Sequence, residues 1–199
     1  MKLITIDIDG ILNNYPICWI NYVNNELGTS YQSKEEIKSS IGIDEYNKIK
    51  DKYRNSYYKA NIMVNYDSLR FLNRLSSEGD FVIFILTSRP ILDKKRYPNL
   101  EQLTLKWLIK NNIPFDNLHY KFDDHFFLEM AENYDYICHI DDDLQDGLFF
   151  AKRGIQTIIF SLDDIKNVPY NNLIFIQKID DLLFYINNRI KKDILREVL

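Results

Sequence analysis

Short apolar runs alternate with stretches of helical periodicity along most of the chain. Six of these runs have the length of buried strands, at residues 3–8, 81–86, 118–120, 136–140, 157–160 and 173–176. Stretches with apolar positions spaced near 3.6 residues lie between them. Strands that alternate with helices predict an α/β fold built on a doubly wound parallel sheet.

The segment between the first two strands differs from the rest because its periodicity is helical only. Apolar spacing after Pro16 and a capping box that begins at Ser33 predict helices there. We therefore expect residues 14–64 to form a small helical cap. The α/β core would then consist of residues 1–13 and 65–199.

The composition is that of an ordinary globular protein, with 46% hydrophobic and 27% charged residues in a chain of 199. A net charge of -4 argues against binding to a nucleic acid polymer or to an anionic membrane surface. Cys18 and Cys138 are far apart in apolar surroundings, which favours buried thiols in a reducing compartment. The chain shows neither a signal-peptide pattern nor an apolar run approaching ~20 residues, so we expect a cytoplasmic protein.

The first strand ends in two carboxylates followed by a glycine. Asp7 and Asp9 are two positions apart, so both would face the same side of the strand where it ends. Carboxylates this close repel each other unless a cation lies between them, and oxygen-rich groups of this kind suit Mg²⁺. Gly10 then allows a sharp turn and a close approach of the backbone to a ligand. The plainer alternative is a solvated, Asp-rich turn.

Two further strands end in reactive polar residues. Thr87, Ser88 and Arg89 follow the second of the long apolar runs, while Asp141 and Asp142 follow another. Ligands of doubly wound sheets bind at the carboxyl ends of the strands, so we expect these groups to converge with the first strand end. A capped helix start is the alternative for the two acids.

These residue types suit phosphoryl transfer. Asp7 could attack phosphorus as a nucleophile, and Asp9 could give a proton to the leaving oxygen and later take one from water. Thr87 offers a hydroxyl to a phosphoryl oxygen, and the backbone around it offers N–H groups. Asp141 and Asp142 would complete the Mg²⁺ shell.

Lys121 follows the strand predicted at residues 118–120. It could neutralise the nucleophile and the transferring phosphate, for which a fixed cation is needed. We expect its ammonium within hydrogen-bond reach of Asp7 or of a bound phosphate. A solvated surface lysine is the alternative.

The letters DIDGIL at residues 7–12 resemble the DxDGxL nucleophile motif of the haloacid dehalogenase-like (HAD) superfamily. The apolar strand that ends in Thr87 resembles its second motif, and IDDD at residues 140–143 resembles its acidic fourth motif. The order and rough spacing agree from residue 3 to about residue 160. By this resemblance Asp7 is the nucleophile and Asp9 the acid/base, and the fold is HAD-like and Rossmannoid.

The resemblance further implies that Thr87, together with Gly10, Ser88 and Arg89, binds the substrate. It also implies metal ligation by Asp7, Asp9, Asp141 and Asp142. The departure is at the third motif, where the family's lysine usually precedes a helix that leads into the acidic strand. Lys121 is the candidate for that lysine.

The second carboxylate, Asp9, favours a phosphatase, because the dehalogenase branch lacks it. The helical insertion at residues 14–64 resembles a C1 cap, and with the TSRP turn at residues 87–90 it is similar to the 5′-nucleotidase branch. The implied function is therefore Mg²⁺-dependent hydrolysis of a small phosphorylated substrate, with nucleoside monophosphates leading. The alternatives are a phosphatase of another phosphometabolite and a HAD-fold binding or regulatory protein with little turnover.

Overall fold

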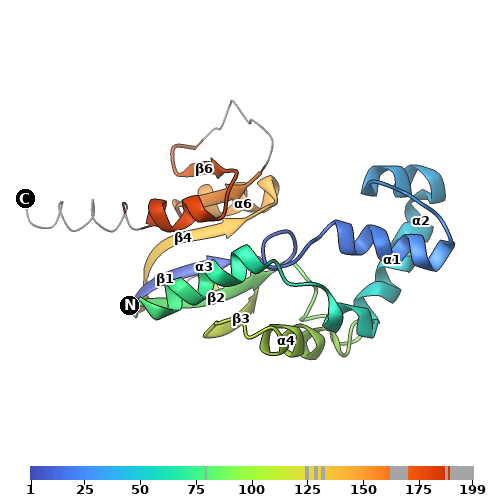
Figure 1. Cartoon of the computed structure of the whole chain (residues 1–199), viewed down its shortest axis with the longest axis horizontal. Coiled ribbons are helices and arrows are strands. Elements are labelled where there is room, and N and C mark those ends of the chain that lie inside the picture. Colours follow the sequence, from blue (N-terminus) through green and yellow to red (C-terminus); the bar gives the residue numbers. More distant parts are fainter. Residues whose placement is uncertain are drawn as a thin grey trace, which may run out of the picture.

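The structure is a computed structural model that describes residues 1–78, 80–123, 126–127, 130, 133–161, 170–186 and 188. The end of the expected core, residues 189–199, lies outside the described residues. Within the described residues, parallel strands form one sheet in the order β3-β2-β1-β4-β5-β6 (Figure 1). The strands are β1 (Lys2–Ile6), β2 (Phe81–Thr87), β3 (Asn117–Tyr120), β4 (Asp135–Asp141), β5 (Thr157–Phe160) and β6 (Leu173–Ile176). The predicted doubly wound parallel sheet is confirmed.

Both faces of the sheet are covered, because alternate side chains of each strand enter different apolar clusters. On one face Ile4 packs in a cluster with Leu72 of α3 (Tyr66–Ser77) and Trp107 of α4 (Leu100–Lys110). On the other face Leu3 packs in a cluster with Phe150 of α6 (Leu144–Ala151). Burial on two faces explains why the strands read as nearly continuous apolar runs.

The first strand ends two residues earlier than predicted, at Ile6. Its hydrogen bonding nevertheless continues one residue further, since the backbone N–H of Asp7 donates to the carbonyl oxygen of Ile140 at 2.9 Å. The position of Asp7 is therefore fixed by the sheet itself, between β2 and β4.

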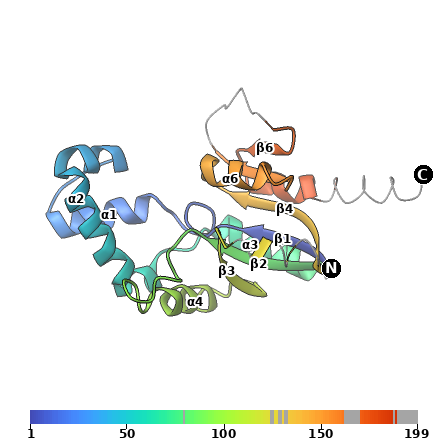
Figure 2. The same cartoon turned by 180° about the vertical axis from the view of Figure 1, so that it is seen from behind.

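The helical segment after β1 lies beyond the carboxyl end of that strand in both views of the molecule (Figures 1 and 2). It contains α1 (Ile17–Leu27), α2 (Lys34–Asn55) and the 3₁₀ helix η1 (Tyr57–Asn61). Gly42, at φ 76°, divides α2 into two helical parts, because only glycine adopts this conformation readily. The Ser33 hydroxyl accepts from the N–H of Glu36, as the capping box predicts. Buried aromatic rings, those of Trp19 and Tyr53 among them, pack α1 against α2.

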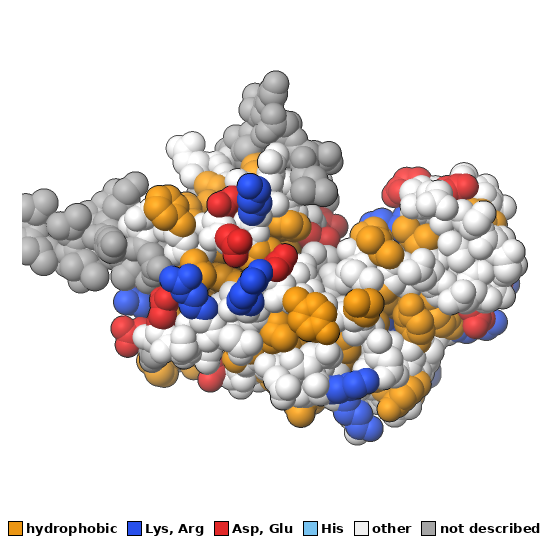
Figure 3. Space-filling view, viewed as in Figure 1, with side chains coloured by type: hydrophobic (Ala, Val, Ile, Leu, Met, Phe, Trp, Pro, Cys, Tyr) orange, Lys and Arg blue, Asp and Glu red, His pale blue; other side chains and the backbone are white. Residues whose placement is uncertain are grey.

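The face seen in Figure 3 carries charged side chains of both signs over the sheet and several exposed hydrophobic side chains nearer the helical segment. Tyr57, Met63 and Tyr66 are among the exposed hydrophobic residues of the molecule. Among the helices described, none has the length and apolar character needed to cross a membrane.

Candidate active site

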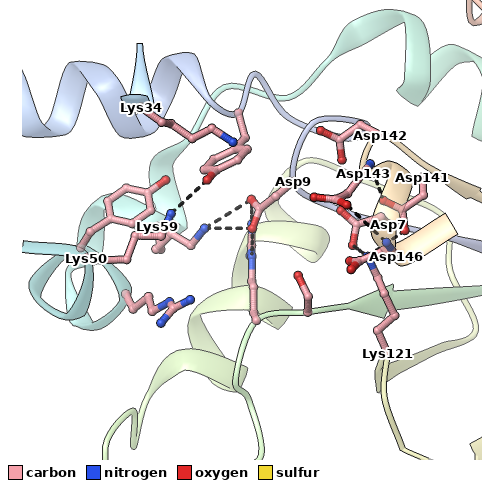
Figure 4. A pocket seen from close by; sticks show the side chains of 15 residues that line it. Asp7, Asp9, Lys34, Lys50, Lys59, Lys121, Asp141, Asp142, Asp143 and Asp146 are labelled. Carbon is pink, nitrogen blue, oxygen red and sulfur yellow. Dashed lines mark hydrogen bonds and ion pairs between the residues drawn. The ribbon is translucent and has the colours of Figure 1, made fainter. Parts of the chain in front are cut away.

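One cavity of about 280 Å³ lies where the strand ends meet the helical segment (Figure 4). Seven of the site residues predicted from the sequence line it: Asp7, Asp9, Ser88, Arg89, Lys121, Asp141 and Asp142. Thr87 and Gly10 do not belong to the lining residues. The expected convergence of three strand ends is therefore present, with these two residues in supporting positions behind it.

Lys121 is buried at the centre of the acidic part of the cavity. Its Nζ lies 2.9 Å from Oδ1 of Asp7, 2.8 Å from Oδ2 of Asp141 and 2.7 Å from Oδ2 of Asp146. The residue follows β3 directly, and its backbone N–H donates to the carbonyl oxygen of Thr87 at 2.9 Å, which fixes its place. Burial alone would lower the pKa of Lys121, but the surrounding carboxylates raise it above its usual value. The ammonium is therefore permanently charged.

The three acids nearest the strand ends carry more negative charge than Lys121 can neutralise. Burial raises the pKa of Asp7 to about 7 against the opposing effect of Lys121, and the charge of Asp141 adds to the rise. Burial, followed by the charges of Asp7 and Asp141, raises the pKa of Asp142 to about 8. Burial acts in the same direction on Asp141, but the hydrogen bond from His139 and the charge of Lys121 lower its pKa to about 2. Such crowding is relieved by a bound cation.

The same three acids have the donor set that a divalent cation requires. Asp7, Asp141 and Asp142 each offer a carboxylate oxygen, and these oxygens lie within 4.8 Å of one another. Oδ1 of Asp7 is buried and faces the Lys121 ammonium at 2.9 Å. A set of hard oxygen donors of this kind fits Mg²⁺, which would supply positive charge where a phosphoryl group becomes more negative.

Gly10 shapes this donor set from behind. Its φ of 95° is one that residues with a side chain rarely adopt, and a Cβ added there would lie 1.9 Å from Oδ2 of Asp142. The carboxylate of Asp142 thus occupies the space that a side chain at position 10 would need. The structure gives Gly10 a role in seating Asp142.

His139, two residues before Asp141 in β4, contacts the Asp141 carboxylate. Its Nε2 is 2.9 Å from Oδ2 of Asp141, and its Nδ1 is 2.8 Å from the hydroxyl oxygen of Thr5. Burial lowers the pKa of His139 despite its contact with Asp141. Both ring nitrogens are engaged, so the ring orients the Asp141 carboxylate.

Asp9 points away from the acidic cluster and is held by cations. Arg89 donates to it through Nη2 at 2.6 Å and Nε at 2.8 Å, and Lys59 of η1 lies 3.3 Å away. Asn13 adds a further hydrogen bond at 2.8 Å. Burial would raise the pKa of Asp9, but Arg89 and Lys59 together hold it well below its usual value. In this arrangement Asp9 is ionised and carries no proton to donate.

Within the protein, Thr87 and Arg89 make contacts that the sequence analysis did not predict. The buried hydroxyl oxygen of Thr87 accepts from the backbone N–H of Arg89 at 3.1 Å. The guanidinium of Arg89 donates hydrogen bonds to Asp9 and, through Nη1, to the hydroxyl oxygen of Thr104 at 3.2 Å. Ser88, which lies between them, is exposed at the cavity. The first contact is local to the turn, whereas the contacts of the guanidinium join residues far apart in the sequence.

The helical segment contributes a set of cations that sequence reasoning missed: Lys34, Lys50, Arg54 and Lys59. Lys50 donates to the hydroxyl oxygen of Tyr15 at 3.1 Å, and burial together with the charge of Lys59 lowers its pKa to about 7. Burial and the charge of Arg89 lower the pKa of Lys59 to about 8. In the sequence these lysines belong to a weakly amphipathic stretch, where lysine is normally solvated.

Asp146 is the other residue missed. It stands in the first turn of α6, and this helix begins directly after the end of β4, with Asp143 as its N-cap. The signal that could have found it is its spacing, since one helical turn after a strand end returns a side chain to the same edge of the sheet.

No known family profile matches the sequence, and no curated protein sequence resembles it. Solved structures do resemble the fold. The magnesium-bound HAD-hydrolase YfnB of Bacillus subtilis superimposes with a TM-score of 0.62 at 12% identity, covering 94% of this chain and 98% of that one. The haloacid dehalogenase-like hydrolase SP0104 of Streptococcus pneumoniae superimposes with a TM-score of 0.58 at 18% identity, covering 93% of this chain and 98% of that one.

The D,D-heptose 1,7-bisphosphate phosphatase of Burkholderia thailandensis gives a TM-score of 0.51 at 13% identity, covering 92% of this chain and 99% of that chain. At these identities the likeness concerns the fold. The chain thus has the fold of HAD hydrolases over nearly its whole length, which agrees with the superfamily that the motifs resemble.

Proposed function

We propose that this protein is a phosphomonoesterase that depends on a divalent cation, Mg²⁺ by expectation, and uses Asp7 as its nucleophile. The observation that carries the proposal is the position of Lys121, a buried ammonium 2.9 Å from Asp7, beside three carboxylates that fit a metal. Lys121 together with a cation bound by these carboxylates would place positive charge where a phosphoryl group in transfer carries negative charge.

The reaction would proceed in two steps. An oxygen of Asp7 attacks phosphorus, the bond to the leaving oxygen breaks, and that oxygen takes a proton from Asp9. Water then attacks the aspartyl phosphate, gives a proton to Asp9 and releases inorganic phosphate, which restores the Asp7 carboxylate. Lys121 remains charged throughout and stabilises the nucleophile before and after each step.

Asp9 must leave its resting contacts before it can act as the acid. Arg89 and Lys59 hold it ionised, and both are cations that a substrate phosphate could attract instead. Binding of the substrate would then weaken their hold on Asp9 and allow it to take up a proton. We propose that residues 14–64 serve as a cap in this sense, because Lys59 belongs to that segment.

The second candidate function is a binding or regulatory protein with little turnover. The observation that favours it is the pairing of Asp9 with Arg89 and Lys59, which we call the clamp on Asp9. An Asp9 that stays ionised could not protonate a leaving group. The narrower choice of nucleoside monophosphates as substrates rests on the resemblance of the sequence to the 5′-nucleotidase branch, and it stays a prediction.

Phosphate release from a panel of phosphomonoesters tests the proposal. The panel includes nucleoside monophosphates, sugar phosphates and phosphorylated acids, each with Mg²⁺ and with EDTA. Release that requires Mg²⁺ and disappears in Asp7→Asn supports the enzyme. Saturable binding of panel members without release supports the binding protein.

A further inference from the structure

The charges that line the cavity are separated into two ends. The acidic end carries Asp7, Asp141 and Asp142 with Lys121, all of which lie at strand ends. The opposite end carries Lys34, Lys50 and Lys59, and Figure 4 shows these three across Asp9 from the acids. The separation follows the architecture, since the sheet supplies the first end and the helical segment the second.

Three of the six cations that line the cavity pair with carboxylates of the protein, and the other three do not. Asp9 pairs with Lys59 and Arg89, and the acids pair with Lys121. In the part of the chain that the structure describes, Lys34, Lys50 and Arg54 form no ion pair with a carboxylate. The Nη1 of Arg54 donates to the hydroxyl of Tyr97 at 3.1 Å.

Aromatic rings hold two of these cations in place. The ammonium of Lys50 lies 4.8 Å from the ring centroid of Tyr15 and 4.6 Å from that of Trp19, and Lys34 lies 5.3 Å from the Tyr15 ring on its own side. Like charges gathered at a partly buried site destabilise the fold unless an anion binds among them. Three cations that line one cavity and pair with no carboxylate of the described residues therefore favour an anionic ligand.

We propose that the substrate carries a second anionic group, a phosphate or a carboxylate, which binds to Lys50, Arg54 and Lys34. The inference rests on the proposed function for the acidic end of the cavity, where the phosphate to be removed binds beside Asp7. A cavity of about 280 Å³ that must hold both groups points to a small substrate. Bisphosphates and phosphorylated carboxylic acids have this character, whereas a nucleoside monophosphate lacks the second group.

Matched pairs of compounds test the second anion independently of the carbon skeleton. The pairs are glycerol 3-phosphate with 3-phosphoglycerate, glucose 6-phosphate with glucose 1,6-bisphosphate, and adenosine 5′-monophosphate with adenosine 3′,5′-bisphosphate. Dissociation constants are measured by calorimetry with Mg²⁺ in an Asp7→Asn background, which prevents turnover. In at least one pair, the compound with two anionic groups should bind about tenfold more tightly, or better, than its counterpart with one. Charge-assisted hydrogen bonds to the second group account for a difference of this size.

The variants locate the effect. Lys50→Gln should remove most of that preference, and Arg54→Gln provides a second test should Lys50→Gln unfold. Lys48→Gln is the matched control, because Lys48 is on the same helix but is exposed and pairs with Glu45. The proposal is overturned if no pair shows the preference, or if it survives in both Lys50→Gln and Arg54→Gln.

Phosphate release by the protein with Asp7 intact tests the proposed phosphatase function separately from the second-anion site. A preference for the second anion without any release leaves the second-anion site standing and removes the phosphatase. Release without preference in any pair leaves the phosphatase standing and removes the site.

Discussion

The two ends of the cavity are built from different kinds of structure. At the acidic end, the side chains extend from strands whose register the sheet fixes, and Lys121 is itself tied by its backbone to Thr87 at 2.9 Å. At the cationic end, the side chains come from helices that pack through aromatic rings, and Lys34, Lys50 and Arg54 form no ion pair with a carboxylate of the described residues. The first end is thus held in register by the sheet and carries an excess of negative charge that suits a bound cation, whereas these three cations of the second end suit an anion.

We propose separate tasks for the two ends. Chemistry requires groups held in a fixed geometry, which strand ends provide. Recognition can use groups on a segment that is less firmly joined to the sheet. Asp9 lies between the two, because it belongs to the strand end but is held by Lys59 from the helical segment. Substitutions should therefore have smaller effects on turnover the farther the substituted residue lies from the nucleophile.

Asp7→Asn should have the largest effect on turnover. The variant lacks the attacking oxygen but keeps the shape of the side chain, so we expect loss of about 10⁴–10⁶-fold in kcat with the fold intact. Phosphate release and thermal unfolding measure the two quantities. Release at the wild-type rate would exclude Asp7 as the nucleophile.

Asp9→Asn should slow both chemical steps by about 10²–10⁴-fold, which is the usual contribution of a general acid and base. Substrates with good leaving groups need less protonation, so the loss should be smaller for p-nitrophenyl phosphate than for an alkyl phosphate. Equal losses for the two substrates would assign Asp9 to holding Arg89 and Lys59 rather than to proton transfer.

Lys121→Ala should reduce kcat/KM by about 10²–10³-fold, as expected for one preorganised positive group. It also removes the cation shared by Asp7, Asp141 and Asp146, so the free energy of unfolding should fall by about 3–5 kcal/mol in EDTA. Mg²⁺ should restore more stability to this variant than to the wild type. Equal stabilisation of both proteins by Mg²⁺ would argue against a metal among these acids.

Gly10→Ala should weaken Mg²⁺ binding by about tenfold, because its Cβ would displace the carboxylate of Asp142. Gly28→Ala is the control: its φ is also positive, at 64°, but a Cβ there meets nothing within 4 Å. Both variants should lose about 1–2 kcal/mol of stability from the left-handed backbone. Calorimetric titration with Mg²⁺ distinguishes them, and equal affinities would show that Gly10 does not seat Asp142.

The last prediction concerns the pH dependence of stability without metal. Asp142 has a pKa of about 8 in the folded protein against 3.8 ordinarily, so the folded state holds a proton that the unfolded chain releases. Its contribution to stability is therefore present below pH 3.8 and is lost as pH rises toward about 8. Asp142→Asn should abolish this part of the slope, measured as the difference in unfolding free energy from the wild type in EDTA. If the unfolding free energy of the variant depended on pH as that of the wild type does, Asp142 would not be the source of this pH dependence.

The sheet and the acidic end could be predicted because their signals are local. Apolar runs mark buried strands, and residues that directly follow them must lie at the carboxyl edge. The same rule placed Lys121 near Asp7, although only four residues form β3. Asp146 escaped because it belongs to the helix rather than to the strand end.

The cationic end and the clamp on Asp9 could not be predicted in the same way. In the sequence, Lys50 of α2 and Lys59 of η1 look like solvated lysines, and only the packing of these two helices over the strand ends brings them to the cavity. Arg89 and Asp9 are 80 residues apart in sequence, so their ion pair depends on the neighbouring positions of β1 and β2. The role of Thr87 in binding a phosphate stays a prediction, since its hydroxyl oxygen accepts from Arg89 and its proton remains free to donate.

The most direct test of the central claim is detection of phosphate on Asp7 during turnover. The protein is mixed with its best substrate and Mg²⁺, quenched in acid within the first turnovers, digested, and analysed by mass spectrometry. We expect one phosphoryl group on the peptide that contains Asp7, and none in Asp7→Asn or in EDTA. Rapid phosphate release with that peptide unmodified at every time of quenching, or with the group on another peptide, would contradict the account.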